Sequence, residues 1–321
     1  MRTITVLITI CSLSFPSYAK YGGGTGEPND PYKLATADDL LLLGDSPEDY
    51  GRHFILTADI DLDPNLPGRK VFDKAVIAPD DDQTKDWFQG TPFTGVFDGN
   101  GHTISHLTIE GKGYLGLLGQ LESGAEVKDL GVVDVSITGS GYYVGGLVGW
   151  NRFAAVVTHC YSTGTVRGSE YVGGLVGYNE YGAVTHCYST GAVSGTGEHG
   201  NVGGLVGDNH GQVTQCYSTG AVGGDSRVGG LVGYNYQGSV THSFWDIQTS
   251  GQASSAGGTG KTAAQMQDIQ TYLDAGWDFV GEDYNGTHEV WQMPEGGGYP
   301  LLAVLSGYVP PQLIGLGPIQ V

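Results

Sequence analysis

A repeated hexapeptide constrains this chain more than any other feature. Val144-Gly-Gly-Leu-Val-Gly149 returns at 172–177, 202–207 and 228–233, after a looser copy at 114–119. The last glycines of these copies are 30, 28, 30 and 26 residues apart. Each period holds short β-forming runs separated by glycine, which opposes helix, and a propeller blade needs about 40 residues. The repeat therefore predicts an all-β parallel β-helix with coils of 26–30 residues.

Equivalent residues of successive coils should lie above one another at the strand spacing of about 4.8 Å. A second motif, Thr158-His-Cys-Tyr-Ser-Thr-Gly164, returns at 185–191 and 214–220. We expect an asparagine ladder of hydrogen-bonded amides and a column of inward thiols, and we expect the four motif valines to form one parallel ladder. Parallel cysteines lie farther apart than a disulfide prefers, which predicts buried, reduced thiols. The ladder residues are Asn151, Asn179, Asn209 and Asn235, and Cys160, Cys187 and Cys216.

These motifs resemble the GLUG-motif repeat of bacterial surface proteins, which also occurs beside the peptidase domain of some immunoglobulin A-cleaving metallopeptidases. The resemblance covers about 113–245. The segments Phe97-Asp-Gly-Asn-Gly-His-Thr-Ile104 and Gly298-Tyr-Pro300 resemble the usual flanks of such proteins. The resemblance implies a right-handed β-helix at the bacterial surface and no known catalytic chemistry. The peptidase motif His-Glu-x-x-His is absent from the sequence.

The flanks of the repeats predict caps that cover the open ends of the solenoid. Thr36 and Thr262 are expected to cap short helices, the second running over 266–273, and Ser46-Pro47 should begin another. Trp277, Phe279 and Trp291 are expected to plug the last coil. The predicted units are a signal peptide over 1–19, an N-terminal cap and first coils with an acidic loop excursion over 20–112, repeat coils over 113–245, a C-terminal cap over 246–305 and a flexible tail over 306–321.

Several patterns in the sequence are candidate metal, phosphate or catalytic sites. Asp80, Asp81 and Asp82 are candidate calcium ligands, and no other cofactor is predicted. His159, His186 and His242 form a column that either shares a transition metal or simply occupies a bend. The run at 257–262 lacks the first glycine of a phosphate-binding loop. A polysaccharide hydrolase needs two facing acids, which the repeat coils do not obviously supply, so we expect no catalysis.

Two aromatic columns are the candidate ligand-binding residues. Strand alternation predicts that both face outward, where exposed rings stack on sugars or dock a protein. The alternative is a self-stacking ladder that stiffens the solenoid. The columns are Trp150, Tyr178 and Tyr234, and Tyr161, Tyr188 and Tyr217.

The net charge of the chain limits the classes of partner that it can bind. The formal charge is −20, with 34 acidic and 14 basic residues, which disfavours nucleic acid. No apolar run long enough to span a membrane follows the predicted signal peptide. The sequence thus predicts a secreted or cell-surface, adhesin-like binding or structural module whose partner is a glycan or a surface protein. The alternatives are a polysaccharide-degrading hydrolase or lyase and a purely architectural envelope component.

Overall fold

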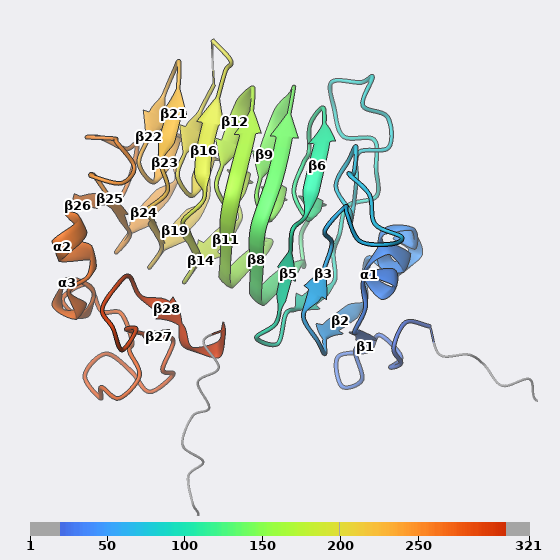
Figure 1. Ribbon diagram of the computed structural model, residues 1–321, viewed down its shortest axis with the longest axis horizontal. Helices are drawn as coiled ribbons and strands as arrows, with labels where there is room; N and C mark the ends of the chain where they lie inside the picture. The colour runs from blue at the N-terminus through green and yellow to red at the C-terminus, as the bar shows by residue number, and fades with distance from the viewer. Residues whose placement is uncertain (1–19, 199, 306–321) are drawn as a thin grey trace, which may run out of the picture.

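The computed structural model describes residues 20–198 and 200–305, and it is a parallel β-solenoid of about five turns. Its coils lie side by side along the long axis of the molecule, with short helices at both ends (Figure 1). The predicted fold class is therefore confirmed. The predicted signal peptide and flexible tail lie outside the described residues. None of the described helices has the length and apolar character that crossing a membrane requires.

Three parallel sheets form the walls of the solenoid. One sheet contains β7 (Leu118–Leu121), β10 (Val148–Arg152), β13 (Val176–Glu180), β18 (Val206–Asn209) and β23 (Val232–Asn235). A second contains β9 (Tyr142–Gly145), β12 (Glu170–Gly173), β17 (Val202–Gly203) and β22 (Val228–Gly229).

The third and largest sheet runs through both the first coils and the repeat coils. Its members before the repeats are β1 (Tyr32–Leu34), β2 (His53–Leu56), β3 (Ile60–Asp61), β4 (Val96–Asp98), β5 (Thr103–Ser105), β6 (Thr108–Gly111) and β8 (Glu126–Gly139). The others are β11 (Val156–Gly168), β14 (Ala183–Thr185), β15 (Tyr188–Ser189), β16 (Ala192–Gly195), β19 (Gln212–Thr214), β20 (Tyr217–Ser218), β21 (Val222–Gly224), β24 (Ser239–Thr241), β25 (Phe244–Asp246) and β26 (Thr259–Lys261).

The register of the coils follows the sequence repeat. Val144 pairs with Val172, which pairs with Val202, which pairs with Val228, all in parallel. The predicted valine ladder is confirmed. The motif valines and leucines are buried in one continuous core, except Val228, which is half-buried and packs against it.

The glycines of the motif allow two strands of neighbouring coils to approach closely. A Cβ atom at Gly177 would lie 2.6 Å from the backbone nitrogen of Val144 in the coil before it, and one at Gly207 would lie 2.6 Å from that of Val172. Real Cβ atoms do not come this close to backbone atoms. The motif is therefore glycine-rich because the backbones of neighbouring coils touch there.

Short helices cover the ends, as the capping residues predict. α1 (Ala37–Gly44) begins at a capping box made by Thr36 and Asp39, and the short 3₁₀ helix η1 (Pro47–Asp49) follows it. At the other end, the expected single helix is split into α2 (Ala263–Met266) and α3 (Ile269–Leu273). The reason is local: the Asp268 carboxylate accepts a hydrogen bond from the Gln270 N–H and starts a new helix.

The C-terminal segment, which we call the strap (residues 277–305), runs back along the solenoid instead of only closing its end. It contains the antiparallel pair β27 (Trp291–Gln292) and β28 (Leu301–Leu302) and ends in the 3₁₀ helix η2 (Ala303–Leu305), which contacts β8 (Figure 1). Trp277, Phe279 and Trp291 are buried, as expected. Trp277 lies against Phe244 of the last coil, whereas Trp291 reaches Tyr188 two coils earlier.

Candidate functional site

The first aromatic column belongs to a larger group of rings, the ring stack, formed by Tyr143, Trp150, Tyr171 and Tyr178. Tyr143 stands on β9 and Trp150 on β10, on the two sides of the motif turn, and their rings stack 4.9 Å apart at 11°. Tyr143 also stacks on Tyr171 at 5.1 Å and on Tyr178 at 5.6 Å. All four residues are half-buried. Burial raises the pKa of the Tyr143 and Tyr178 hydroxyls.

The same two positions change their chemistry in the later coils. In the fourth copy they are Asn201 and Asp208, and the Asn201 amide donates to the Asp208 carboxylate at 2.7 Å. In the fifth copy they are Arg227 and Tyr234, with the guanidinium 4.4 Å from the ring centroid. In each of these coils, the two residues at these positions therefore interact with each other.

A polar chain joins the ring stack to the coil after it. His210 Nε2 lies 3.2 Å from Asp208 Oδ1, and its Nδ1 lies 3.4 Å from the Tyr178 hydroxyl. Burial raises the pKa of both the Asp208 carboxyl and the Tyr178 hydroxyl. These contacts therefore fix the positions of the Tyr178 and His210 rings.

The second aromatic column does not face solvent as expected. Tyr161 is half-buried, while Tyr188 and Tyr217 are buried. The rings stack in register at 4.8 and 4.9 Å. The strap covers them: Trp291 packs on the last two, and the Tyr217 hydroxyl donates to the Pro300 carbonyl at 2.6 Å. The rings lie outside the inner core, as expected, but the expected exposure to solvent is wrong, because strand alternation predicts the side of a sheet and not what packs on it.

The asparagine ladder runs through the interior of the repeat coils. The Nδ2 atom of Asn151 donates to Asn179 Oδ1 at 2.8 Å, Asn179 to Asn209 at 2.7 Å, and Asn209 to Asn235 at 2.8 Å. The first three members are fully buried. The amide of Asn179 also donates to the Gly182 carbonyl at 3.3 Å, so the ladder fixes the turn that follows it.

The three repeat cysteines are buried and unbridged, as predicted. Each thiol donates to the carbonyl of the threonine two residues before it, at 3.1 to 3.2 Å. Burial raises the pKa of the Cys187 thiol, which keeps it protonated and unreactive.

The histidine column occupies a bend. His159, His186 and His242 have φ of 49°, 51° and 49°, and Gln215 between them has 52°. The rings of His159 and His186 stack 5.0 Å apart. Burial, and then the neighbouring His159, lower the pKa of His186 to about 4. No group of three acidic, histidine or cysteine residues within 20–198 and 200–305 is arranged to hold a metal ion.

The three candidate calcium ligands are engaged in separate contacts. Asp80 is buried and accepts from the Gln89 N–H at 2.8 Å. Asp81 forms an ion pair with Lys74 at 2.8 Å, and Asp82 accepts from the Thr84 N–H at 3.1 Å.

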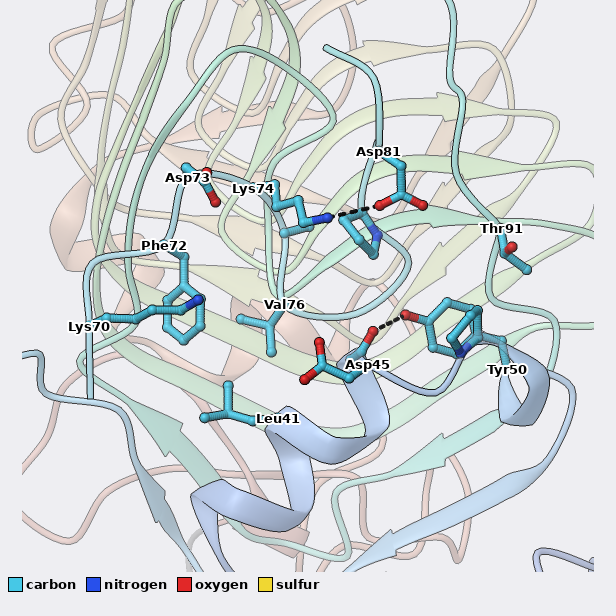
Figure 2. Close-up of a pocket in the computed structure, with 14 residues that line it drawn as sticks. Leu41, Asp45, Tyr50, Lys70, Phe72, Asp73, Lys74, Val76, Asp81 and Thr91 are labelled. Carbon is cyan, nitrogen blue, oxygen red and sulfur yellow. Dashed lines mark hydrogen bonds and ion pairs between the residues drawn. The ribbon is translucent and has the colours of Figure 1, made fainter. Parts of the chain in front are cut away.

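A pocket of about 320 Å³ lies at the N-terminal cap, between α1 and the loop excursion (Figure 2). Leu41 and Val76 face its interior, and Lys74 reaches across to Asp81. The Tyr50 hydroxyl donates to the Gly44 carbonyl at 2.8 Å, and burial raises its pKa to about 12. The polar groups named here already have protein partners, so we assign the pocket to the packing of the cap.

A third set of aromatic side chains stands at the turns that follow the asparagine ladder. We call it the turn stripe: Phe153, Tyr181, His210 and Tyr236. Phe153, Tyr181 and Tyr236 are 41%, 60% and 48% exposed. The rings of Phe153 and Tyr181 are parallel within 5° at 6.3 Å, and His210 lies 5.2 Å from Tyr236. Three of these four rings are exposed on turns of the repeat coils, and the stripe is the best candidate for a recognition surface.

Sequence reasoning missed both Tyr143 with Tyr171 and the turn stripe. The first pair had a readable signal, because tyrosine precedes the motif in two successive copies, at 143 and 171. The turn stripe had a weaker signal, because Phe153 and Tyr181 follow the ladder asparagine by two residues, whereas His210 and Tyr236 follow it by one.

Comparison with known proteins gives the family relationship of the repeats. The model of the GLUG motif matches residues 140–167, 168–194 and 224–244. The chain carries GLUG repeats. Halomucin from Haloquadratum walsbyi is 31% identical over 153 residues, which are 46% of this chain and 2% of that protein. A protein described as a candidate Gly-rich membrane protein from Evansella cellulosilytica is 38% identical over 87 residues, 25% of this chain and 10% of that one. The chain thus spans a small part of these relatives.

The GLUG solenoid also has a solved structural neighbour. The crystal structure of a protein from Bacteroides ovatus, described as a candidate immunoglobulin A1 protease, superimposes with a TM-score of 0.62 over 88% of this chain and 95% of that one. Its identity to the GLUG chain is 17%, so the likeness shows the fold alone.

Proposed function

We propose that this chain is an extracellular or cell-surface module that combines a stiff spacer with recognition of a ligand, and that it performs no catalysis. The relatives named halomucin and a membrane protein suggest a surface or structural role. The in-register ladders supply stiffness, because valine, asparagine and tyrosine columns tie each coil to the next along its full width.

The turn stripe carries the recognition half of this proposal. Large rings exposed on three of four successive turns of a rigid solenoid cost free energy in water unless something binds them. They lie on one side of the molecule in a line set by the coil register, so the binding surface is a face and not an enclosed pocket. Adhesion through such a face needs no moving part.

Two measurements test the function. Antibodies to the protein should label intact source cells without permeabilisation, and beads coated with the protein should adhere to surfaces that uncoated beads do not hold. Beads coated with a variant in which Phe153, Tyr181 and Tyr236 are alanine, the stripe variant, should adhere poorly. Labelling only after permeabilisation would overturn the location, and equal adhesion by the stripe variant would overturn the assigned surface.

The polysaccharide-degrading alternative is tested in parallel. Release of reducing ends or unsaturated products from any polysaccharide by the purified protein would contradict the absence of catalysis. The account expects none.

A further inference from the structure

A shallow groove of about 520 Å³ runs beside the turn stripe across four successive coils. Tyr181 and His210 line it on the turn side, and Gln212 and Ser239 line it on the side of strands β19 and β24. Because equivalent parts of successive coils line it, the groove follows the solenoid axis, and its lining repeats at about the strand spacing of 4.8 Å.

The floor of the groove is closed by the asparagine ladder. Gly182 and Gly211 form this floor, and a Cβ atom at Gly182 would lie 2.7 Å from Asn179 Oδ1, while one at Gly211 would lie 2.7 Å from Asn179 Nδ2. Larger residues would displace the buried amides. The floor is therefore flat, and the exposed rings rise above it.

The turn beside the groove repeats its backbone conformation from one coil to the next. Tyr181, which lines the groove, has a φ of 58°, and Phe153 in the coil before it has a φ of 43°. Arg152 and Glu180, the residues before them, are paired in register, so the two rings occupy equivalent places on successive turns.

The chemistry of the lining selects one class of ligand. Two aromatic side chains, two glutamine amides and a serine hydroxyl line the groove together with small residues, and no Asp, Glu, Lys or Arg does. Nearby Arg152 is held by Glu180 and Glu122 at 2.9 and 3.4 Å. A surface of rings, amides and hydroxyls without ions matches a neutral sugar, whose C–H faces stack on rings and whose hydroxyls pair with amides.

Two other classes of ligand fit less well. A protein segment that adds as a strand needs a free sheet edge, but the strands here are already paired on both sides, as β19 is by β14 and β24. An anionic glycan would be repelled by a chain of net charge −20.

We propose that this groove binds a neutral, linear glycan laid along the solenoid axis, with successive sugar rings against the rings of successive turns. The proposal rests on the proposed function and names its ligand class and site. Both nitrogens of His210 are engaged by Asp208 and Tyr178, so His210 offers its ring to the ligand while its neighbours hold the orientation.

Affinity electrophoresis of the purified protein tests the proposal. The native gels would contain hydroxyethyl cellulose, galactomannan or xylan as neutral probes, and polygalacturonate as the anionic probe. We expect retardation in at least one neutral gel. The stripe variant should lose roughly a hundredfold in affinity, since each of its three stacked rings contributes a factor of about five.

Two further variants separate binding from folding. Gln212→Glu has the same shape and adds a charge inside the groove, so it should weaken binding about tenfold while the melting temperature stays unchanged. Tyr284→Ala removes a ring that is 92% exposed on the strap and should bind as the parent does.

The proposal is overturned if no neutral gel retards the protein, if only polygalacturonate does, or if the stripe and Gln212→Glu variants are retarded like the parent. Failure here stays distinguishable from failure of the proposed function. Beads that still adhere through the turn stripe while no neutral glycan binds would leave a recognition module with a protein ligand.

Discussion

At the scale of single residues, equivalent side chains of successive coils stack into a column. A residue inside the column interacts with the equivalent residue before it and with the one after it. Asn179 illustrates this, since it accepts from Asn151 and donates to Asn209 inside the core. The end of the column is different: Asn235 is half-buried and receives a single ladder bond. A substitution in the middle of a column should therefore lower the free energy of unfolding more than a substitution at its end.

Replacing Asn179 with alanine tests this gradient. The change leaves buried amide groups on both sides without their partner, which should lower the free energy of unfolding by about 2–4 kcal/mol. Asn235→Ala is the matched control and should cost less than half as much. Urea denaturation of both variants measures the difference, and equal losses would show that the ladder bonds are not what stabilises the coils.

His186 adds a pH dependence at the same scale. Its pKa falls from the ordinary 6.5 to about 4 in the folded protein, so the unfolded chain takes up a proton that the folded chain refuses. Stability should therefore decline as the pH falls from about 6.5 to 4, by about 3 kcal/mol from this group.

His186→Gln is the matched variant, because glutamine occupies the equivalent bend at 215 with the same positive φ. Between pH 6.5 and 4, the free energy of unfolding of the variant should fall by about 3 kcal/mol less than that of the parent. At pH 8 the two should differ little. Free energies of unfolding measured from pH 8 to 4 would contradict the account if parent and variant declined in parallel.

At the scale of elements, the strap decides which aromatic column faces water. The strap covers Tyr188, against which Trp291 packs, and Tyr217, whose hydroxyl donates to the strap. Trp150 and Tyr178 lie on a wall with no strap and stay half-exposed. Two columns of similar sequence thus differ because of a segment far along the chain.

Trp291→Ala tests the role of the strap. Removal of this buried ring opens a cavity over the tyrosine column and should lower the free energy of unfolding by about 3–5 kcal/mol. Tyr284→Ala, on the exposed part of the same segment, should change it by less than about 0.5 kcal/mol. Binding of an apolar dye should rise in the first variant only. A wild-type unfolding curve for Trp291→Ala would mean that the strap is loosely attached.

The same contrast shows what sequence can and cannot predict here. In a parallel solenoid the neighbour of a residue is its equivalent one period away, so the valine, asparagine and cysteine columns were readable from spacing. The cover on Tyr188 comes from Trp291, about a hundred residues later and outside the repeat, and no periodicity links them. The turn stripe was missed because its rings do not share one position: Phe153 and Tyr181 follow the ladder asparagine by two residues, whereas His210 and Tyr236 follow it by one.

At the scale of the whole molecule, the account divides the aromatic residues of one wall by role. The ring stack joins neighbouring coils and is half-buried, so it stiffens the solenoid. The turn stripe stands in water, and in the proposed function it recognises a ligand. Stiffness and recognition are thereby separated onto side chains that a mutation can remove independently.

One comparison of two variants tests this division most directly. The stack variant carries Tyr143→Ala and Trp150→Ala, and the stripe variant is as defined above; melting temperature and retardation by the neutral polysaccharide are measured on the same samples. The account predicts that the stack variant melts about 5–10 °C earlier with its affinity retained, whereas the stripe variant keeps its melting temperature and loses its affinity. A stack variant that melts normally and no longer binds, beside a stripe variant that still binds, would contradict it.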